Sequence, residues 1–413
     1  FCILSPPGSG KTTVAAAMAA EVFTIFILEK LQLLLSVQNV AVDNMGSQLK
    51  RMDLEEGEVY NMKTKRLNPQ DLAPFDFFDL MRKEELEEWK KGNNSKKGRK
   101  KFTKRQKSLE EMIIFHRREF EKGVNPKIFL STVEMVIHKM LTSVLKNAIS
   151  NVKRIIIDEA SLLTEAALFA IIRRFPEARI VLIGDDQQLS PFQYDPNILG
   201  HELAGRPALS VVMKTGKCPI VEMNEVYRAP PSLIAPYNRL SYGGRLVSKK
   251  AEGEALLSEI GLVCPGFPQL LLIDVEGMEE YDIGDHTKIF NTKEMEAGVR
   301  FVRSLPSDWT KDIMIICLYK EQKLRLDQML NGRQWPKQYT ILTVDSAQGK
   351  EAPIVIVLTT RSVRATDFFC SINRCNVAVS RHQKALIILG KASLLTTNHP
   401  WSTVINGDDF TRI

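Results

Sequence analysis

The first residues that suggest chemistry form a glycine-containing loop after a short apolar run at the start of the chain. The loop reads Ser5-Pro-Pro-Gly-Ser-Gly-Lys-Thr12, and an alanine-rich helical pattern follows it. In such a loop, backbone N–H groups and the helix N-terminus surround the β-phosphate of a nucleotide, while the lysine reaches the β- and γ-oxygens. Ser5 stands where this pattern has its first glycine, and a side chain there restricts the backbone. The candidate nucleotide contacts are Gly8, Ser9, Gly10, Lys11, Thr12 and Thr13.

Carboxylates follow a second apolar run, Arg154-Ile-Ile-Ile-Asp-Glu-Ala-Ser161. After a phosphate-binding loop, Asp158 is expected to hold Mg²⁺ together with the Thr12 hydroxyl, and Glu159 to orient or deprotonate an attacking water. A third apolar run ends in Asp-Asp-Gln-Gln, where Gln188 is the candidate sensor of a γ-phosphate. Two adjacent acids after a strand can also be simple loop solvation, so this prediction depends on the phosphate-binding loop.

The elements that position these residues alternate between β-rich apolar runs and helical patterns, which indicates an α/β fold with parallel sheets. Ligands of such sheets bind beyond the carboxyl ends of the strands, where the candidate residues stand. A Gly- and Pro-containing stretch after residue 189 suggests a first domain at 1–218 and a second at 219–413. The predicted strands are 1–4, 33–37, 154–157, 179–183, 270–273, 313–317, 339–344, 354–358 and 385–389.

Charge is concentrated in one segment of the first domain. The chain of 413 residues has a net charge of +7, and residues 82–123 carry fifteen basic and eight acidic residues, the same excess of seven. Helix-forming composition on both sides of residues 96–107 predicts a charged helical insert at about 60–125. Its basic tip is interpreted either as a contact to a phosphate backbone or as a solvated loop or nuclear-import signal.

Composition excludes several classes of protein. Apolar residues make up 44% and charged residues 25%, which is typical of a globular protein. No apolar run reaches the length of about 20 residues that a membrane span needs, so no membrane partner is expected. The six cysteines are scattered, without zinc-site spacing, and are expected to be reduced thiols of a cytoplasmic or nuclear protein. The chain opens without an initiator methionine, so further sequence is expected upstream.

The order of the motifs resembles superfamily 1 helicases, in particular the branch of the nonsense-mediated-decay RNA helicase and senataxin. Beyond the three segments above, the resemblance rests on Ser36-Val-Gln-Asn-Val-Ala-Val-Asp43, Glu225-Val-Tyr-Arg-Ala-Pro-Pro231, Ile315-Ile-Cys-Leu-Tyr-Lys-Glu-Gln322, Thr343-Val-Asp-Ser-Ala-Gln-Gly-Lys-Glu351 and Asn373-Arg-Cys-Asn-Val-Ala-Val-Ser-Arg381. It implies two tandem RecA-like P-loop domains, with the charged insert in the first.

The resemblance also implies roles for individual residues. Arg228 and Arg381 are expected at the γ-phosphate, and Gly349 and Glu351 near the nucleotide. Arginines from one domain can complete a nucleotide site on the other only when the domains close, so ATP hydrolysis can drive movement along a strand. The implied nucleic-acid contacts are Asn39, Val40, Asp43, Thr343, Ser346 and Arg361. The alternative for each is an ordinary loop or helix-capping role.

The expected function is therefore that of an ATP- and Mg²⁺-dependent helicase or translocase that acts, as a monomer, on single-stranded nucleic acid. Family grounds favour RNA over DNA, and protein partners are expected to bind through the upstream region. A second hypothesis is a nucleotide-gated nucleic-acid-binding or scaffold protein with a degenerate ATPase. That hypothesis rests on Ser5 and on the missing upstream part.

Overall fold

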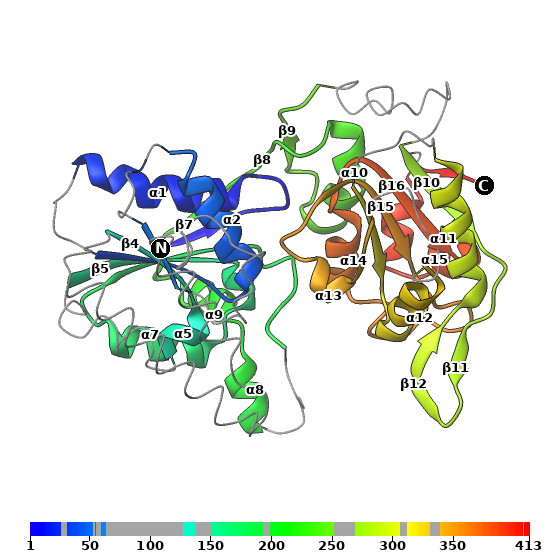
Figure 1. Cartoon of the computed structure of the whole chain (residues 1–413), viewed down its shortest axis with the longest axis horizontal. Coiled ribbons are helices and arrows are strands. Elements are labelled where there is room, and N and C mark those ends of the chain that lie inside the picture. The colour runs from blue at the N-terminus through cyan, green and yellow to red at the C-terminus, as the bar shows by residue number, and fades with distance from the viewer. Residues whose placement is uncertain are drawn as a thin grey trace, which may run out of the picture. The chain divides into compact units, whose positions relative to one another are not determined.

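The computed structural model describes two compact units (Figure 1). The first comprises Phe1–Leu4, Lys11–Asp185 and Ser190–Glu222, and the second comprises Ser5–Gly10, Asp186–Leu189 and Met223–Ile413. Two loops that the sequence places in the first domain, 5–10 and 186–189, thus group with the second unit. The described residues are 1–25, 31–52, 54, 59–62, 127–137, 151–192, 199–251, 269–305, 312–330, 339–407 and 409–413. From residue 63 onward, the predicted charged insert lies outside them.

The first unit is a parallel sheet with helices on both faces. Its strands follow the order β3-β4-β2-β5-β6-β1-β7, and every ladder between them is parallel. Helices α1 (Lys11–Ile25) and α2 (Asn39–Leu49) cover one face, and the helices that lie on the other are α5 (Val133–Ile137), α7 (Glu165–Arg174) and α9 (Ala208–Lys214) (Figure 1). The strands are β1 (Cys2–Leu4), β2 (Leu31–Ser36), β3 (Val59–Met62), β4 (Ile128–Thr132), β5 (Val152–Asp158), β6 (Arg179–Gly184) and β7 (Ile220–Glu222).

The second unit has a parallel sheet of its own, in the order β14-β13-β15-β16-β10-β17. Its strands are β10 (Leu270–Asp274), β13 (Ile313–Cys317), β14 (Tyr339–Thr343), β15 (Ala352–Leu358), β16 (His382–Gly390) and β17 (Thr411–Arg412). Two short ladders accompany it, β8 (Glu225–Val226) with β9 (Val247–Ser248) and the antiparallel hairpin β11 (Glu280–Asp282) with β12 (Asp285–Phe290).

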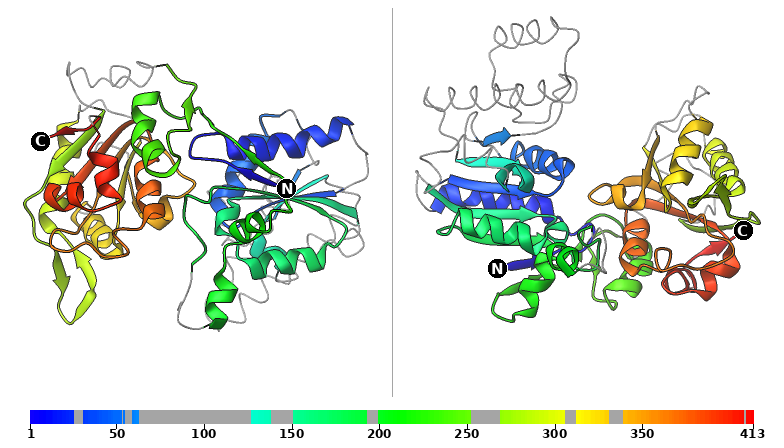
Figure 2. Two further views of the ribbon diagram at one scale, coloured as in Figure 1. Left: turned by 180° about the vertical axis from the view of Figure 1, so that it is seen from behind. Right: turned by 90° about the horizontal axis from the view of Figure 1, so that it is seen from below.

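Helices also cover both faces of the second sheet (Figure 2). One face carries α11 (Thr292–Ser304) and α12 (Lys320–Leu330). The helices of the other group are α10 (Pro231–Ser241), α13 (Val344–Ala347), α14 (Ile372–Val379), α15 (Ala392–Thr397) and α16 (Trp401–Ile405). Because both faces are covered, the central strands β13 and β15 are wholly apolar.

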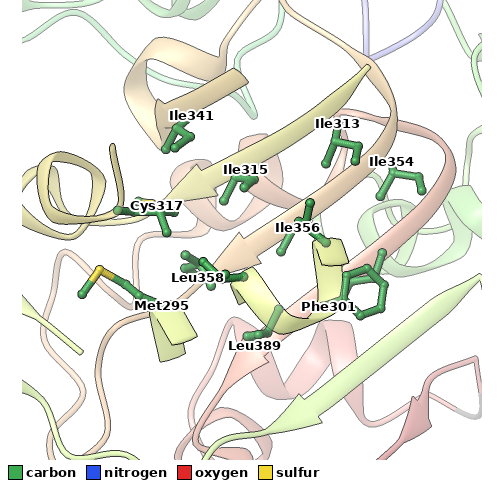
Figure 3. Packing of buried hydrophobic residues seen from close by; sticks show 14 of the residues in the cluster. Met295, Phe301, Ile313, Ile315, Cys317, Ile341, Ile354, Ile356, Leu358 and Leu389 are labelled. Carbon is green, nitrogen blue, oxygen red and sulfur yellow. The ribbon is translucent and has the colours of Figure 1, made fainter. Parts of the chain in front are cut away.

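The core beneath α11 and α12 shows how the strand sequences specify this packing (Figure 3). Alternate residues of β13 and β15, among them Ile315, Cys317 and Ile356, point to the same face and are buried. Met295 and Phe301 of α11 pack against them. The period of two along each strand and of three to four along the helix places these apolar side chains in one layer.

All nine predicted strands are confirmed, since each lies within or overlaps a strand of the structure. The sequence missed the short strands β3, β4, β7, β8, β9, β11, β12 and β17. Of these, β4 has five residues and is wholly buried, and periodicity cannot identify so short an apolar run as a strand. The five described cysteines are free thiols. No helix in the described part of the chain combines the length and the apolar content of a membrane span.

Candidate functional site

The phosphate-loop residues 5–10 adopt a conformation that their sequence explains. Gly8 and Gly10 have positive φ angles of 76° and 86°, which glycine adopts without a steric penalty. The Ser9 hydroxyl donates to the carbonyl of Pro6 at 2.7 Å, and its oxygen lies 2.7 Å from the Ser5 hydroxyl. Ser5 itself is buried and is not among the described residues with positive φ. The serine at the first glycine position therefore fits the loop without backbone strain.

Gly8 is also required by close packing within the second unit. Its carbonyl accepts a hydrogen bond from the Tyr227 N–H at 2.8 Å. A Cβ atom at Gly8 would lie 2.5 Å from the Cβ of Arg228, closer than real Cβ atoms approach. The loop backbone thus lies directly against the segment that carries the first candidate arginine.

Replacing Gly8 by alanine is expected to reduce the free energy of unfolding by about 1–3 kcal/mol more than replacing Gly10. Both variants add strain at a positive φ, but only the Gly8 variant also adds a clash, because nothing lies within 4 Å of a Cβ at Gly10. Urea denaturation of both variants without nucleotide measures the difference. Equal losses would show that the contact with Arg228 does not constrain the loop.

In the first unit, the start of α1 lies beside the end of β5. The Thr12 hydroxyl donates to Asp158 Oδ2 at 2.9 Å, and Lys11 Nζ lies 3.3 Å from Glu159 Oε1. The Glu159 N–H donates to Asp158 Oδ1 at 2.9 Å. Parallel-sheet topology explains this meeting, since β1 and β5 both end at the same edge and α1 begins there. The structure therefore brings together four predicted residues.

Electrostatics at this cluster favour a cation. Asp158 is fully buried, and burial together with the neighbouring Glu159 charge raises its pKa to about 6. Lys11 and the Thr12 hydroxyl oppose this shift. One hydroxyl beside one carboxylate suits Mg²⁺, which is usually held by one or two carboxylates plus waters and substrate phosphates. Glu159 has a φ of 54°, an unusual angle for a residue other than glycine and one often found at functional sites.

The second unit groups the candidate arginines with other predicted residues. Arg228 donates from Nε to Glu351 Oε2 at 2.7 Å and from Nη1 to the Ser380 carbonyl at 2.6 Å. Arg381 is buried and donates from Nη2 to Gln188 Oε1 at 3.2 Å. Burial alone would raise the pKa of Glu351, but the charge and hydrogen bond of Arg228 outweigh it and lower that pKa. The two arginines are thus held in fixed orientations, and Gly349 lies in the same unit with a φ of 75°.

His382, which follows the second arginine, is a buried neutral side chain. Burial lowers its pKa to about 4, and the nearby Arg228 and Arg381 charges act in the same direction. Its Nε2 lies 3.0 Å from the Leu233 carbonyl, which requires the proton on that nitrogen. This histidine therefore adds no charge next to the arginines near neutral pH.

The candidate nucleic-acid contacts of the two units differ in their local structure. In the first unit, Asn39, Val40 and Asp43 lie in the first turns of α2, whose N-cap residue Gln38 makes no side-chain capping bond. The N–H groups of an uncapped first turn need other partners, and an anion can supply them. Val40 is 37% exposed there. The helix-capping alternative does not describe these residues.

In the second unit, by contrast, capping does describe Thr343 and Ser346. They form a reciprocal capping box at the start of α13, in which the Ser346 N–H donates to the Thr343 hydroxyl and the Thr343 N–H to the Ser346 hydroxyl. Arg361 is paired with Glu279 at 3.0 Å and donates from Nε to the Tyr319 hydroxyl at 3.0 Å. Its side chain is 15% exposed. Their role in nucleic-acid contact remains a prediction.

Sequence reasoning missed several residues that hold the candidate site in place. Asn376 donates to the Gln187 carbonyl at 2.9 Å, and Asn373 donates to that of Gln188, so α14 fixes the segment that carries the candidate sensor Gln188. Outside that site, the buried Glu294 of α11 was missed as well, although Asn291-Thr-Lys-Glu294 has the spacing of a helix N-terminus. That spacing signals a cap and gives no indication that the carboxylate is buried.

Comparison with known proteins gives two family matches and several relatives. Two models, each described as an AAA domain, match residues 77–194 and 205–393. The 5'-3' DNA helicase ZGRF1 of Mus musculus is 30% identical over 261 residues, 61% of this chain and 13% of that protein. Helicase sen1 of Schizosaccharomyces pombe is 26% identical over 270 residues, 62% of this chain and 16% of that protein. Regulator of nonsense transcripts 1 of Dictyostelium discoideum is 25% identical over 423 residues, 98% of this chain and 30% of that protein. The chain thus spans less than a third of the length of each of these relatives.

Proposed function

Because the homologues of this chain are helicases of the senataxin, Sen1 and nonsense-transcript-regulator kind, we propose that it is itself an ATP-dependent motor on single-stranded nucleic acid. The matches to AAA domains support ATP as the substrate. The names of the relatives include both a DNA helicase and a regulator of transcripts. RNA is the proposed substrate, since the transcript regulator aligns with 98% of this chain, and DNA is the alternative that the assay distinguishes.

The observation that carries this proposal is the contact of Lys11 and Thr12 with the carboxylates at the end of β5. Lys11 is paired with Glu159 at 3.3 Å. The phosphates of ATP compete for the lysine, and Glu159 then orients a water and accepts a proton from it. Thr12 and Asp158 would hold Mg²⁺, which supplies charge neutralisation at the phosphate oxygens.

The second unit is proposed to complete the reaction. Arg381 and Arg228 stabilise the charge that develops on the γ-phosphate, and Gln188, bonded to Arg381, responds to the presence of that phosphate. Loss of the phosphate after hydrolysis removes the group that holds the arginines to the phosphate loop. A strand bound by both units would then be moved, because its two attachment sites change separation once per cycle.

Contacts to the strand are proposed to be independent of base identity. The first turn of α2, with Asn39, Val40 and Asp43, offers backbone N–H groups to a phosphate, and Arg361 and the α13 N-terminus contribute from the second unit. Contacts of this kind position a backbone and carry no sequence information. A motor that moves along strands of any sequence needs this tolerance.

The test is ATP turnover with and without single-stranded RNA or DNA of matched length and sequence. Stimulation by a single strand is expected, and a larger stimulation by RNA than by DNA would support the proposed substrate. Turnover that neither strand stimulates, in folded protein, would contradict the proposal. The scaffold hypothesis predicts nucleic-acid affinity that changes with ATP analogues while turnover stays at background. The serine at position 5 was one of the two reasons for that hypothesis, and Ser5 fits the loop without backbone strain.

Replacing the basic run 96–107 by a glycine–serine linker of equal length is expected to weaken RNA binding and to flatten its salt dependence. The slope is that of the logarithm of the binding constant against the logarithm of the salt concentration. Each lost phosphate contact should reduce it by about 0.7 for a single strand. Fluorescence anisotropy with labelled RNA over a salt series measures the slope. The control is a variant with glutamine in place of the exposed Lys214 and Lys217. An unchanged slope in the linker variant would indicate that the basic run is a solvated loop or a nuclear-import signal.

A further inference from the structure

Glu294, on the first turn of α11, is a fully buried carboxylate that no role above uses. Its two oxygens accept four hydrogen bonds. Oε1 accepts from the N–H and the hydroxyl of Thr359, and Oε2 accepts from the Thr360 N–H at 2.6 Å and from Gln322 Nε2 at 3.3 Å. These four hydrogen bonds give each oxygen of the carboxylate two donors, and its described partners include no cation.

The bonded N–H groups belong to the turn that follows β15. Thr360 has a φ of 69°, which is costly for a β-branched residue and persists only where surrounding structure enforces it. Successive N–H groups around a residue of this conformation form a concave anion-binding nest. Here the group in the nest is the Glu294 carboxyl of the same chain, which carries the matching negative charge when it is ionised, so α11 supplies what enforces the strained turn.

A second carboxylate binds the next part of the same turn. Glu279 Oε2 accepts from the N–H of Ser362 at 2.8 Å and of Val363 at 3.2 Å, and Glu279 Oε1 pairs with Arg361. The Arg361 N–H donates to the Thr359 carbonyl at 2.8 Å. All five consecutive N–H groups from 359 to 363 therefore have partners, four of them on the two carboxylates.

We propose that Glu294 and Glu279 form a two-carboxylate clamp that positions the 359–363 turn, and with it Arg361, for contact with a single strand. Glu294 is a positioning residue in this proposal, because it acts through Thr359 and Thr360. The nucleic-acid part rests on the proposed function. The clamp itself follows from the hydrogen bonds of the second unit alone.

The clamp explains how the turn can serve a motor. Its N–H groups are occupied, so a phosphate must bind to side chains, and the exposed Arg364 follows directly after the clamped residues. The Arg361 guanidinium is fixed by Glu279, by the Tyr319 hydroxyl and by the Tyr281 hydroxyl at 3.1 Å. A fixed guanidinium loses less conformational entropy when it binds a phosphate than a free one does.

Glu294→Gln is the most direct test. Glutamine has nearly the same shape as glutamate, but it turns an NH₂ group toward the N–H donors of Thr359 and Thr360. The expected results are faster hydrogen–deuterium exchange in the peptide that contains 359–363 and RNA affinity at least about tenfold weaker, while ATP turnover without RNA stays unchanged. Glu296→Gln, on the same helix and paired with Lys293 at the surface, is the matched control. It should change none of these quantities.

A pH series separates positioning from a general structural role. Burial raises the pKa of Glu294 to about 8, although the hydrogen bonds from Thr359 and Thr360 oppose the shift. The carboxylate is therefore ionised above that pH, and the RNA affinity of the wild type is expected to rise with pH through this range, whereas that of the glutamine variant is not. The Cys317 thiol on β13 interacts with Glu294 electrostatically, and the Lys323–Asp327 pair on α12 acts on that thiol. The Glu279–Arg361 pair binds the same turn.

The outcomes keep this proposal distinct from the proposed function. A glutamine variant with wild-type exchange rates would overturn the clamp. Faster exchange with unchanged RNA affinity and pH profile would overturn its role in strand contact. If the wild type shows no RNA or DNA binding, the proposed function fails, and the exchange comparison still decides whether the clamp exists. A variant that loses RNA-free turnover and thermal stability together would show a structural role only.

Discussion

Replacing Glu159 by glutamine is expected to reduce ATP turnover by at least about 10²-fold, the usual contribution of a positioned general base. The amide cannot accept a proton from the attacking water, and it also releases Lys11 from the ion pair at 3.3 Å. ATP binding should therefore persist or strengthen while hydrolysis stops. Single-turnover kinetics together with equilibrium binding of ATP separate the two effects.

Lys11→Ala provides the complementary result. It removes the cation that reaches the β- and γ-oxygens, so both binding and turnover should fall to background. The control is Glu165→Gln, which removes an exposed carboxylate paired with Arg206 on the outside of the same unit. Wild-type turnover in either Glu159→Gln or Lys11→Ala would refute the assignment of the nucleotide site.

The second large effect is expected at the arginines of the second unit. Replacing Arg381 by alanine should reduce turnover by about 10³-fold or more, because an arginine that stabilises charge on the γ-phosphate contributes roughly 10³–10⁵ in rate. Arg228→Ala should give a loss of similar size. ATP binding should change far less than turnover, since the charge that these arginines stabilise develops mainly in the transition state.

Arg381 is buried, so its removal also affects folding. Arg381→Lys keeps a charge without the planar fork, and should retain the fold while recovering little of the rate. Arg300→Ala, on the exposed side of α11, is the matched control for loss of one arginine. Turnover at the wild-type rate in a folded Arg381→Lys or Arg228→Ala variant would show that these side chains do not reach the γ-phosphate.

The sequence also indicated which serine and threonine residues have competing roles, but it could not choose between those roles. Thr343 and Ser346 satisfy each other in a capping box, whereas the first turn of α2 has no side-chain cap. The two segments have similar residue types after strands. The segments differ in whether a side-chain hydroxyl lies close enough to accept from a backbone N–H of the helix start. That depends on the path of the backbone after each strand.

By itself, the sequence determined the strands and the residues at their ends. Apolar runs followed by Lys11, Asp158 and Arg361 are local patterns, and parallel strands place such residues at one edge of a sheet. The partners of these residues were decided by the tertiary structure: Glu159 beside Lys11, Gln188 beside Arg381, and the buried Glu294 beneath Thr360. Those pairs are separated by 66 to 193 positions in the chain, and no local pattern records them. They form because packing of helices on the two sheets removes polar groups from water, and each buried donor or acceptor must then bind whatever group the fold has placed within reach.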